Sequence, residues 1–275
     1  MIPTVQELKR GWNSVAKLYS RMIEKPNLQL GISLSRMLNL QTANNIVEVG
    51  CGSGLLSLYL LQNLPPGRKI TSIDLSNEMI SIAQQTKASL ASKINNIDQE
   101  FIEGNAEDLS FIPNESVDAY LSSLCLHLVS DPNKALQESM RILKKGGRIG
   151  FSVLGSEENC SFFQVFNERL KEFNIHVPEK RSVFYLGDRE KLIKFASDNG
   201  IKVDFCWKEN VAMGLIEEDD VEVVAGLPSH RKIIKELDEE KRGMFLKAMK
   251  EDFLRRKKEF MPLVTENTLL IGRKE

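Results

Sequence analysis

The chain has 275 residues, with 37 Lys and Arg, 38 Asp and Glu and a formal net charge of −1, which is an ordinary composition for a globular protein. This length fits one large domain, or one domain with an elaborated cap, around a substantial core. The balanced charge provides no overall basic field for nucleic acid or an anionic membrane, and four scattered cysteines without CxxC spacing predict neither a zinc site nor a disulfide framework.

The first residues, "MIPTVQELKRGWNS", contain no apolar run of signal-peptide length, and no stretch of the chain is apolar enough to span a bilayer. We therefore expect a cytoplasmic protein with no membrane span. Residues 1–40 are expected to form two helices. Thr4 and Glu7 make a capping-box pattern at the start of the first helix, and Pro26-Asn27 separates the two.

From Asn45 onward, apolar runs alternate with amphipathic stretches. Strands are predicted at 45–50, 68–74, 98–105, 116–123 and 147–155. Helices are predicted from Ser53 to Leu64, after a cap at Ser76, and from the Asp131-Pro132 pair to Gly146-Gly147. Alternation of strand and helix indicates a parallel sheet with helices on both faces.

The second half of the chain has a looser pattern. A helix is predicted at 187–200, capped by Asp188 and ended by Gly200, with strands at 201–209 and 266–274. A charged insertion lies at about 217–262, and its acidic run at 217–220 is interpreted as a loop or a helix start. We expect its helices to pack on the body rather than to bind a partner or a membrane, because some apolar residues recur at helical spacing: Ile234, Leu237, Phe245, Met249 and Phe253.

The stretch "VEVGCGSG" (47–54) places three glycines between a predicted strand and a predicted helix. Such a loop lets a ligand approach bare backbone close to the positive helix N-terminus. A dinucleotide-binding GxGxxG pattern would need glycine at the position of Leu55, so the spacing here is GxGxG instead. The loop alone is a weak signal.

Asp74 ends the next predicted strand, where a doubly wound fold presents a carboxylate to a ribose diol. Each charge-assisted hydrogen bond of that kind is worth about 1.5–3 kcal/mol. The alternative is a surface acid that opens the following helix.

Four stretches in this order, "VEVGCGSG", "SIDLSNEMI", "GNAEDLSF" and "RILKKGGRI", resemble the successive motifs of class I S-adenosylmethionine-dependent methyltransferases, over about residues 40–155. The sequence is most similar to the small-molecule branch, which includes quinone-biosynthesis C-methyltransferases and many natural-product enzymes. The N-terminal "GWNSVAKLYSRM" resembles the segment that such enzymes fold over the cofactor.

The resemblance implies an α/β fold: a Rossmann-like, doubly wound, seven-stranded and mostly parallel sheet, with an antiparallel, inserted last strand at about 266–273. One domain would span 1–275, with a helical cap at 1–40, a cofactor-binding core at 41–155 and the rest of the sheet with the insertion at 156–275. The cap and the insertion would form a helical lid over the carboxyl ends of the strands, where open α/β sheets bind ligands.

The resemblance also implies S-adenosylmethionine as cofactor and S-adenosylhomocysteine as product. Asn105 stands where many relatives have Asp, and its amide oxygen can still face the adenine amino group. By position, the implied roles are as follows: Glu48, Gly50, Cys51, Gly52 and Gly54 along the methionine moiety and adenosine; Asp74 on the ribose; Leu75 and Met79 against adenine; Asn105, Ala106 and Glu107 along its edge; Ser122, Ser123 and Leu124 beside the sulfonium; and Tyr19 closing over the cofactor.

Methyl transfer from a sulfonium is an in-line displacement, in which positioning supplies up to about 7–11 kcal/mol of the barrier. No catalytic residue is therefore required by the sequence. His127, after the fourth strand, is a candidate base for a hydroxyl, carboxylic or carbon acid, or a residue that only hydrogen-bonds. His176, His230 and Tyr185 are expected to be ordinary residues, the two histidines at the surface.

Several substrate classes are disfavoured. The stretch "LSSLCLHL" replaces the Asp/Asn-Pro-Pro-aromatic turn of nucleobase amino-methyltransferases, and Cys125 follows Leu124 rather than the usual proline of base C5 methylation. The cysteines are too unpatterned for arsenic methylation, and no acidic metal set is visible, so neither metal nor nucleic acid is predicted. A small organic acceptor is predicted, with a protein side chain as acceptor, or a catalytically silent cofactor-binding scaffold, as alternatives.

Overall fold

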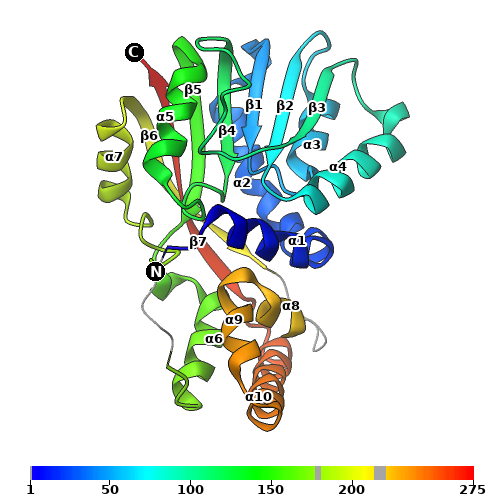
Figure 1. Cartoon of the computed structure of the whole chain (residues 1–275), viewed down its shortest axis with the longest axis vertical. Coiled ribbons are helices and arrows are strands. Elements are labelled where there is room, and N and C mark those ends of the chain that lie inside the picture. Colours follow the sequence, from blue (N-terminus) through cyan, green and yellow to red (C-terminus); the bar gives the residue numbers. More distant parts are fainter. Residues whose placement is uncertain (1, 177–180, 214–220) are drawn as a thin grey trace.

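Seven strands form a single sheet in the computed structural model, which describes residues 2–176, 181–213 and 221–275 (Figure 1). The strand order is β3-β2-β1-β4-β5-β7-β6, and β7 is antiparallel to both of its neighbours while the other pairs are parallel. The predicted fold class is thereby confirmed. The strands are β1 (Asn45–Val49), β2 (Lys69–Asp74), β3 (Asp98–Glu103), β4 (Val117–Ser123), β5 (Leu143–Leu154), β6 (Ile201–Ala212) and β7 (Val264–Lys274).

Helices cover both faces of the sheet because alternate residues of each strand point to opposite sides. Ile46 of β1 belongs to a buried cluster with residues of α2 (Glu24–Met37) and α3 (Leu55–Asn63). Val47 and Val49 belong to another cluster, with residues of α5 (Pro132–Ile142) and α7 (Arg189–Asp198). The other flanking helix is α4 (Asn77–Ser89), and short 3-10 helices lie at Leu40–Thr42, Ala91–Lys93 and Glu157–Asn159.

The N-terminal helices agree only in part with the prediction. Helix α1 (Val5–Met22) begins with the predicted capping box, in which the Glu7 N–H donates to Thr4 Oγ1 at 3.3 Å. Helix α2 already begins at Glu24, so Pro26 lies in its first turn, where no helical N–H is needed, and does not separate the helices. Helix α2 also packs on the sheet, so of the predicted cap at 1–40 only α1 lies across the strand ends.

The boundary after α5 also differs from the prediction. The helix ends at Ile142, and β5 begins at Leu143, before the glycine pair expected to end the helix. Leu143 is buried and pairs with Val117, and the register shifts before Arg148 pairs with Ala119. Burial of this leucine in the sheet therefore outweighs the helical propensity of the two lysines that follow.

Four helices form a separate unit, the helical unit, beyond the end of the sheet where β7 begins (Figure 1). They are α6 (Ser161–Glu172), α8 (Val221–Gly226), α9 (Pro228–Glu236) and α10 (Glu239–Lys258). The predicted apolar stripe forms its core, since Phe245, Met249 and Phe253 are buried against residues of α6. The stripe therefore has the predicted structural role, but its main partner is α6, a helix that the sequence analysis did not identify. The acidic run at 217–220 lies outside the described residues.

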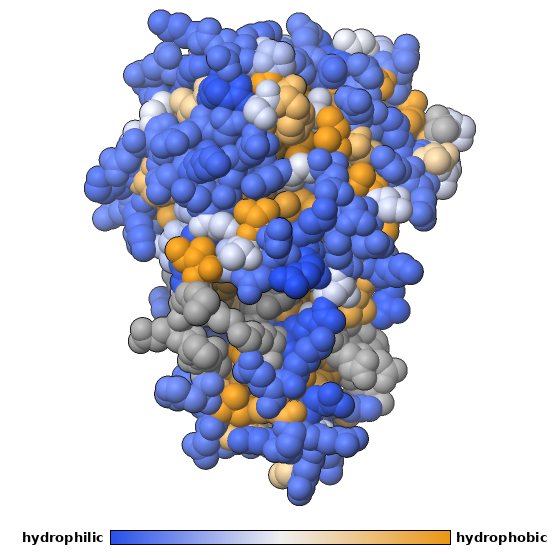
Figure 2. All heavy atoms as spheres, in the orientation of Figure 1, coloured by the Kyte–Doolittle hydropathy of each residue, from blue (hydrophilic) through white to orange (hydrophobic). Residues whose placement is uncertain are grey.

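The surface in the view of Figure 2 is hydrophilic over most of the sheet, and hydrophobic residues show at the waist above the helical unit and on that unit. Within the described ranges, no helix is long and apolar enough to cross a bilayer.

Candidate active site

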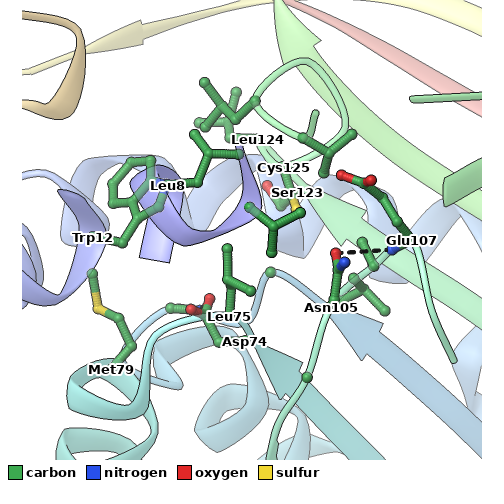
Figure 3. Close-up of a pocket in the computed structure, with 18 of the residues that line it drawn as sticks. Leu8, Trp12, Asp74, Leu75, Met79, Asn105, Glu107, Ser123, Leu124 and Cys125 are labelled. Atoms are coloured by element: carbon green, nitrogen blue, oxygen red, sulfur yellow. Dashed lines mark hydrogen bonds between the residues drawn. The ribbon is translucent and has the colours of Figure 1, made fainter. Parts of the chain in front are cut away.

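A cleft lies at the carboxyl ends of β1, β2 and β4, where the strand order reverses between β1 and β4, the usual ligand position in open α/β sheets. We call it the strand-end cleft. Leu8 and Trp12 of α1 face Asp74, Leu75 and Met79 across it (Figure 3). Its other lining residues are Val5, Tyr19, Val49, Gly50, Gly52, Gly104, Asn105, Ala106, Glu107, Ser123, Leu124, Cys125, Leu128 and Val129.

The glycine loop crosses the floor of the cleft with its backbone in the left-handed region, at φ values of 74°, 56° and 83° for Gly50, Gly52 and Gly54. The Gly50 N–H donates to the carbonyl of Ile73 at 2.8 Å, which ties the loop to β2. A Cβ on Gly50 would lie 2.5 Å from Cβ of Cys125. Glycine is therefore required here both by the backbone conformation and by the close approach of the loop after β4.

Asp74 is fixed at the end of β2 by two backbone groups. The N–H groups of Gly52 and Ser76 donate to its two carboxylate oxygens at 2.9 and 2.8 Å. Burial raises the pKa of Asp74 to about 6, although these two hydrogen bonds act in the opposite direction. The carboxylate is thus held in place beside the cleft with its remaining lone pairs open to a ligand.

Glu48 lies beneath the glycine loop rather than in the cleft. Its carboxylate accepts hydrogen bonds from the hydroxyl of Ser72 at 3.1 Å and from the hydroxyl of Ser57. Burial raises the pKa of Glu48 to about 7. Its side chain joins β1, β2 and α3 under the loop and so supports the loop from behind.

Glu24, which the sequence analysis did not single out, lies on the other side of the loop. It accepts hydrogen bonds from the Leu55 N–H at 3.3 Å and from the hydroxyl of Ser53, at the N-terminus of α3. Its Oε1 would be 3.0 Å from a Cβ placed on Gly52. Burial raises the pKa of Glu24 to about 7, and the charge of Asp74 adds to the increase. The buried Glu24 and Glu48 and the half-buried Asp74 place three carboxylates around one loop and create a site that favours a cationic ligand.

The segment after β3 links the cleft to the loop after β4. Asn105 Oδ1 accepts from the Glu107 N–H at 3.1 Å (Figure 3). Glu107 is buried, and its Oε1 accepts from the Ser130 N–H at 2.8 Å. Glu107 therefore braces the loop after β4 in addition to lining the cleft.

Most of the predicted cofactor residues gather in the strand-end cleft, namely Tyr19, Gly50, Gly52, Asp74, Leu75, Met79, Asn105, Ala106, Glu107, Ser123 and Leu124. Four others do not line it: Glu48, Cys51, Gly54 and Ser122. Gly54 is the N-cap of α3, and a Cβ on it would lie 2.8 Å from Cβ of Ala83, so it serves helix packing.

Some lining residues were missed by the sequence analysis: Val5, Leu8, Trp12, Val49, Gly104, Cys125, Leu128 and Val129. A signal for the first three existed, because they recur at the i, i+3, i+7 spacing of one helix face. Nothing in the local sequence indicated the others.

Helix α1 closes the cleft to a volume of about 90 Å³. Asn13 fastens this helix to the N-terminus of α4: its Oδ1 accepts from the Ser76 hydroxyl at 2.6 Å, and its Nδ2 donates to Asn77 Oδ1 at 2.8 Å. Because ligand pockets usually measure roughly 300–1,000 Å³, α1 has to move outward to admit a ligand of that size.

A second cavity, the outer cavity, has a volume of about 1,020 Å³ and lies between α1, the loop after β4 and the helical unit. The two cavities are adjacent because they share lining residues: Leu8, Trp12, Tyr19, Leu124 and Leu128. His127 lines the outer cavity and not the cleft. It is buried, and its Nδ1 has no hydrogen-bond partner in the described ranges of the chain. Burial lowers the pKa of His127 to about 3, so the imidazole is neutral.

His230 corrects an expectation. It was predicted to be a surface residue, but it is buried and stacks on Phe166 with 3.7 Å between ring centroids. Its Nδ1 lies 2.8 Å from the carbonyl oxygen of Val224. His176 is exposed, as expected, and Tyr185 is partly buried with a hydroxyl that has no partner.

In the part of the chain that the structure describes, no three His, Cys, Asp or Glu side chains are grouped so that they could hold a metal ion. The four cysteines are free. Burial raises the pKa of Cys125 to about 12, so its thiol is not a nucleophile at neutral pH.

Comparison with known proteins places this geometry in context. A family model described as "Methyltransferase domain" matches residues 47–151. A curated demethylmenaquinone methyltransferase of Listeria monocytogenes serotype 4a (strain HCC23) is 26% identical over 168 residues, which cover 59% of this chain and 68% of the relative. A malonyl-[acyl-carrier protein] O-methyltransferase of Paenibacillus sp. (strain JDR-2) is 32% identical over 128 residues, 46% of this chain and 45% of the relative.

A solved structure of a putative methyltransferase from Bacillus halodurans C-125 aligns with 89% of this chain and 98% of its own, at a TM-score of 0.55 and 17% identity, which is a likeness of fold. The matched motifs and the strand order with its antiparallel β7 agree with each other. Residues 47–151 belong to the methyltransferase-domain family, and the sheet around them has the fold of the class I S-adenosylmethionine-dependent methyltransferases.

Proposed function

We propose that this protein transfers the methyl group of S-adenosylmethionine to a small organic acceptor, with the cofactor in the strand-end cleft and the acceptor in the outer cavity. The observation that carries the proposal is the wall shared by the two cavities, where Leu124 and Leu128 line both. A donor in one cavity and an acceptor in the other would meet at that wall.

The residues of the cleft fit the cofactor. S-adenosylmethionine has a net positive charge from its sulfonium and ammonium groups. The carboxylates of Glu24, Glu48 and Asp74, the first two of them buried, surround the glycine loop. We assign Asp74 to the ribose hydroxyls, with Leu75 and Met79 against the adenine ring, as the family resemblance implies. Gly50 and Gly52 provide bare backbone for the methionine moiety, and Glu24 is placed to receive its ammonium group.

The remaining predicted residues have supporting or neighbouring positions. Behind the cleft, the glycine loop and the end of β4 are supported by four of them: Glu48, Cys51, Gly54 and Ser122. Asn105, Ala106 and Glu107 border the adenine edge, Ser123 and Leu124 border the sulfonium, and Tyr19 closes over the cofactor from α1.

The bound cofactor supplies an electrophilic methyl group on sulfur, whose transfer leaves a neutral thioether. The protein contributes alignment across the shared wall and exclusion of water by α1, and correct positioning is worth up to about 7–11 kcal/mol. The neutral His127 imidazole can accept a proton from a hydroxyl acceptor, while a carboxylate acceptor requires no base. Loss of the sulfonium charge weakens the attraction of the carboxylates and favours release of S-adenosylhomocysteine.

A small acceptor is supported by the position of the outer cavity between α1 and the helical unit. One curated relative is named for methylating demethylmenaquinone, a small organic molecule, and another for O-methylating malonyl-[acyl-carrier protein], an acyl group held on a protein.

Calorimetric titration tests the cofactor assignment. We expect S-adenosylmethionine to bind and NAD not to bind, because the third glycine of a dinucleotide loop is replaced by Leu55. Asp74→Asn keeps the shape of the side chain but removes the charge from the ribose contacts, so we expect binding at least about tenfold weaker. Glu78→Gln, which removes an exposed carboxylate on α4, is the matched control and should bind as the wild type does.

A metabolite extract incubated with the protein and methyl-labelled cofactor tests the acceptor. Label in a small organic species supports the proposal, and label in a polypeptide would replace it with side-chain methylation. Tight cofactor binding without any transfer would favour a catalytically silent scaffold, and absence of binding would contradict the cofactor assignment itself.

A further inference from the structure

The outer cavity has an aromatic end, the aromatic chamber, formed by Phe162, Phe163 and Phe166 of α6 together with Phe184. Phe163 makes edge contacts with Phe162 and Phe184, with ring centroids 5.2 Å apart in both pairs. Leu170 and Ile233 extend the apolar wall. Such a lining binds an apolar body rather than a compact polar molecule.

The cavity also has a polar part, which lies against the loop after β4. Arg181 docks on this loop: one N–H donates to the Ser130 carbonyl at 2.9 Å and another to the Val129 carbonyl. Its guanidinium also lies over the Tyr185 ring, 4.7 Å from the centroid. Arg181 is therefore held in a fixed orientation before any ligand binds.

The charge of Arg181 is not neutralised within the described residues, because its two hydrogen bonds go to carbonyls and no ion pair forms there. A guanidinium has five N–H groups in a rigid plane. Two of those of Arg181 bond carbonyls, so three remain available for an anion. A carboxylate is a group that such a donor recognises well, and a phenolate oxygen offers it the same negative charge.

His127 lies on the same loop, 97% buried, and its Nδ1 has no hydrogen-bond partner among the residues that the structure describes. A buried polar atom without a partner is costly, so this atom is expected to meet a polar group of a ligand. Its position between Leu124 and Leu128 places it next to the wall shared with the strand-end cleft. The polar part of the cavity thus lies on the same loop that borders the strand-end cleft.

We propose that the acceptor is an amphiphile, with an acidic oxygen held by Arg181 and His127 beside the shared wall and a large apolar body in the aromatic chamber. This inference rests on the proposed function and specifies its substrate class. In the transfer, an O–CH₃ bond forms at that oxygen while the S–CH₃ bond breaks and its electron pair remains on sulfur. A carboxylate releases no proton, whereas a phenol passes its proton to the imidazole of His127.

Binding of model amphiphiles tests the proposal without any methyl transfer. Trp12 lines the outer cavity, and Trp207 is the only other tryptophan, so the Trp207→Phe variant reports on the cavity by fluorescence. We would titrate this variant with submicellar dodecanoate, 4-nonylphenol and dodecanol. Dodecanoate or nonylphenol should bind at least tenfold more tightly than dodecanol, and shortening the alkyl chain should weaken binding about fourfold per methylene.

Arg181→Gln should weaken dodecanoate binding at least tenfold and change dodecanol binding less than twofold. Arg181→Lys, which restores the charge without the planar fork, should recover part of the loss and shows that the site is still folded. Lys235→Gln removes an exposed cation that lines the same cavity and is the matched control, expected to leave both affinities unchanged. His127→Phe should weaken both dodecanoate and nonylphenol, because the imidazole no longer meets their oxygen, and should change dodecanol binding less; equal binding of all three probes by this variant and its parent would remove His127 from the site.

Equal affinities for dodecanoate, nonylphenol and dodecanol, or the same loss for all three in Arg181→Gln, would overturn the proposal. Absence of binding by all three probes would also overturn it. Titration of the same preparations with S-adenosylmethionine keeps this failure distinct from failure of the proposed function, because the cofactor is measured at the other cavity.

Discussion

Two glycines of this chain have nearly the same backbone conformation in very different surroundings. Gly50, in the cleft, has φ 74°, and Gly67, in the turn before β2, has φ 79°. A Cβ on Gly67 would meet nothing within 4 Å, whereas one on Gly50 would lie 2.5 Å from Cβ of Cys125. The pair separates the cost of a left-handed backbone from the cost of a steric clash.

We expect Gly67→Ala to lower the free energy of unfolding by about 1–2 kcal/mol, the cost of the left-handed conformation alone. Gly50→Ala should cost more and should also abolish cofactor binding, because the loop after β4 must move away. Urea unfolding and calorimetric titration of the two variants measure these effects. The double variant Gly50→Ala/Cys125→Gly lacks the overlapping side-chain atoms, so its stability should return toward that of Gly67→Ala. Equal losses of stability in Gly50→Ala and Gly67→Ala would contradict the clash.

Individual site residues could be predicted from the sequence where their role follows from local chain geometry. Asp74 and the glycines could be predicted because a glycine loop after the first strand and an acid after the second meet at one sheet edge. Glu24 could not, because it reaches the glycine loop only through the packing of α2, 29 positions away from Ser53 in the chain. Trp12 had a helical-spacing signal, but that signal does not say which surface the helix covers.

Helix α1 is held over the cleft by side chains that also border the cofactor-binding segment. Asn13 bonds Ser76 and Asn77, just after Asp74. Removing both hydrogen bonds with Asn13→Ala should cost the closed position about 1–3 kcal/mol, at 0.5–1.5 kcal/mol each. We therefore expect the cofactor to dissociate roughly 5- to 160-fold faster, measured by stopped-flow fluorescence of Trp12 in the Trp207→Phe background.

Ser14→Ala is the matched control for this helix. Ser14 is exposed, and its hydroxyl donates only to the Gly11 carbonyl of the same helix at 2.7 Å. Its dissociation rate should equal that of the parent protein. If Asn13→Ala behaved like Ser14→Ala, α1 would not control release of the cofactor.

Four helix starts were predicted from side-chain caps, whereas α6, which has no such cap, was not identified. Helices α1, α4, α5 and α7 have side-chain caps at Thr4, Ser76, Asp131 and Asp188. Helix α6 begins after Cys160 with no side-chain cap, and its apolar face is buried by α8–α10, far along the chain. The outer cavity combines α1, α6, α9 and the segment at 181–184, so no single stretch of sequence contains its pattern.

On the scale of the whole molecule, buried ionisable groups make folding depend on pH in opposing directions. Burial raises the pKa of Glu24 and Glu48 to about 7 and that of Asp74 to about 6, so the folded state holds protons that the unfolded state releases above its ordinary carboxyl pKa. These groups lower stability as pH rises from about 4.5 to 7. His127 and His230, whose pKa values burial lowers to about 3 and 4, raise stability over the same interval.

Comparison of the wild type with Glu24→Gln isolates one of these contributions, because the histidines and the other carboxylates are common to both proteins. Below about pH 4.5 Glu24 is neutral in both states. As pH rises to about 7.5, the wild type should lose roughly 1–3 kcal/mol of unfolding free energy relative to the variant. Urea unfolding at a series of pH values measures this difference, and a constant difference would mean that Glu24 ionises normally in the fold.

Glu24 should make cofactor affinity depend on pH in the opposite direction to the free energy of unfolding. A cationic ligand favours the ionised form of Glu24, so the affinity of the wild type for S-adenosylmethionine should rise as pH passes through 6 to 7.5, while that of Glu24→Gln should rise less. S-adenosylhomocysteine has no sulfonium charge and should show a shallower dependence. If both ligands gained affinity equally, the carboxylates would interact with the ammonium group that the two ligands share, and not with the sulfonium. Other residues of the cleft would then have to discriminate substrate from product.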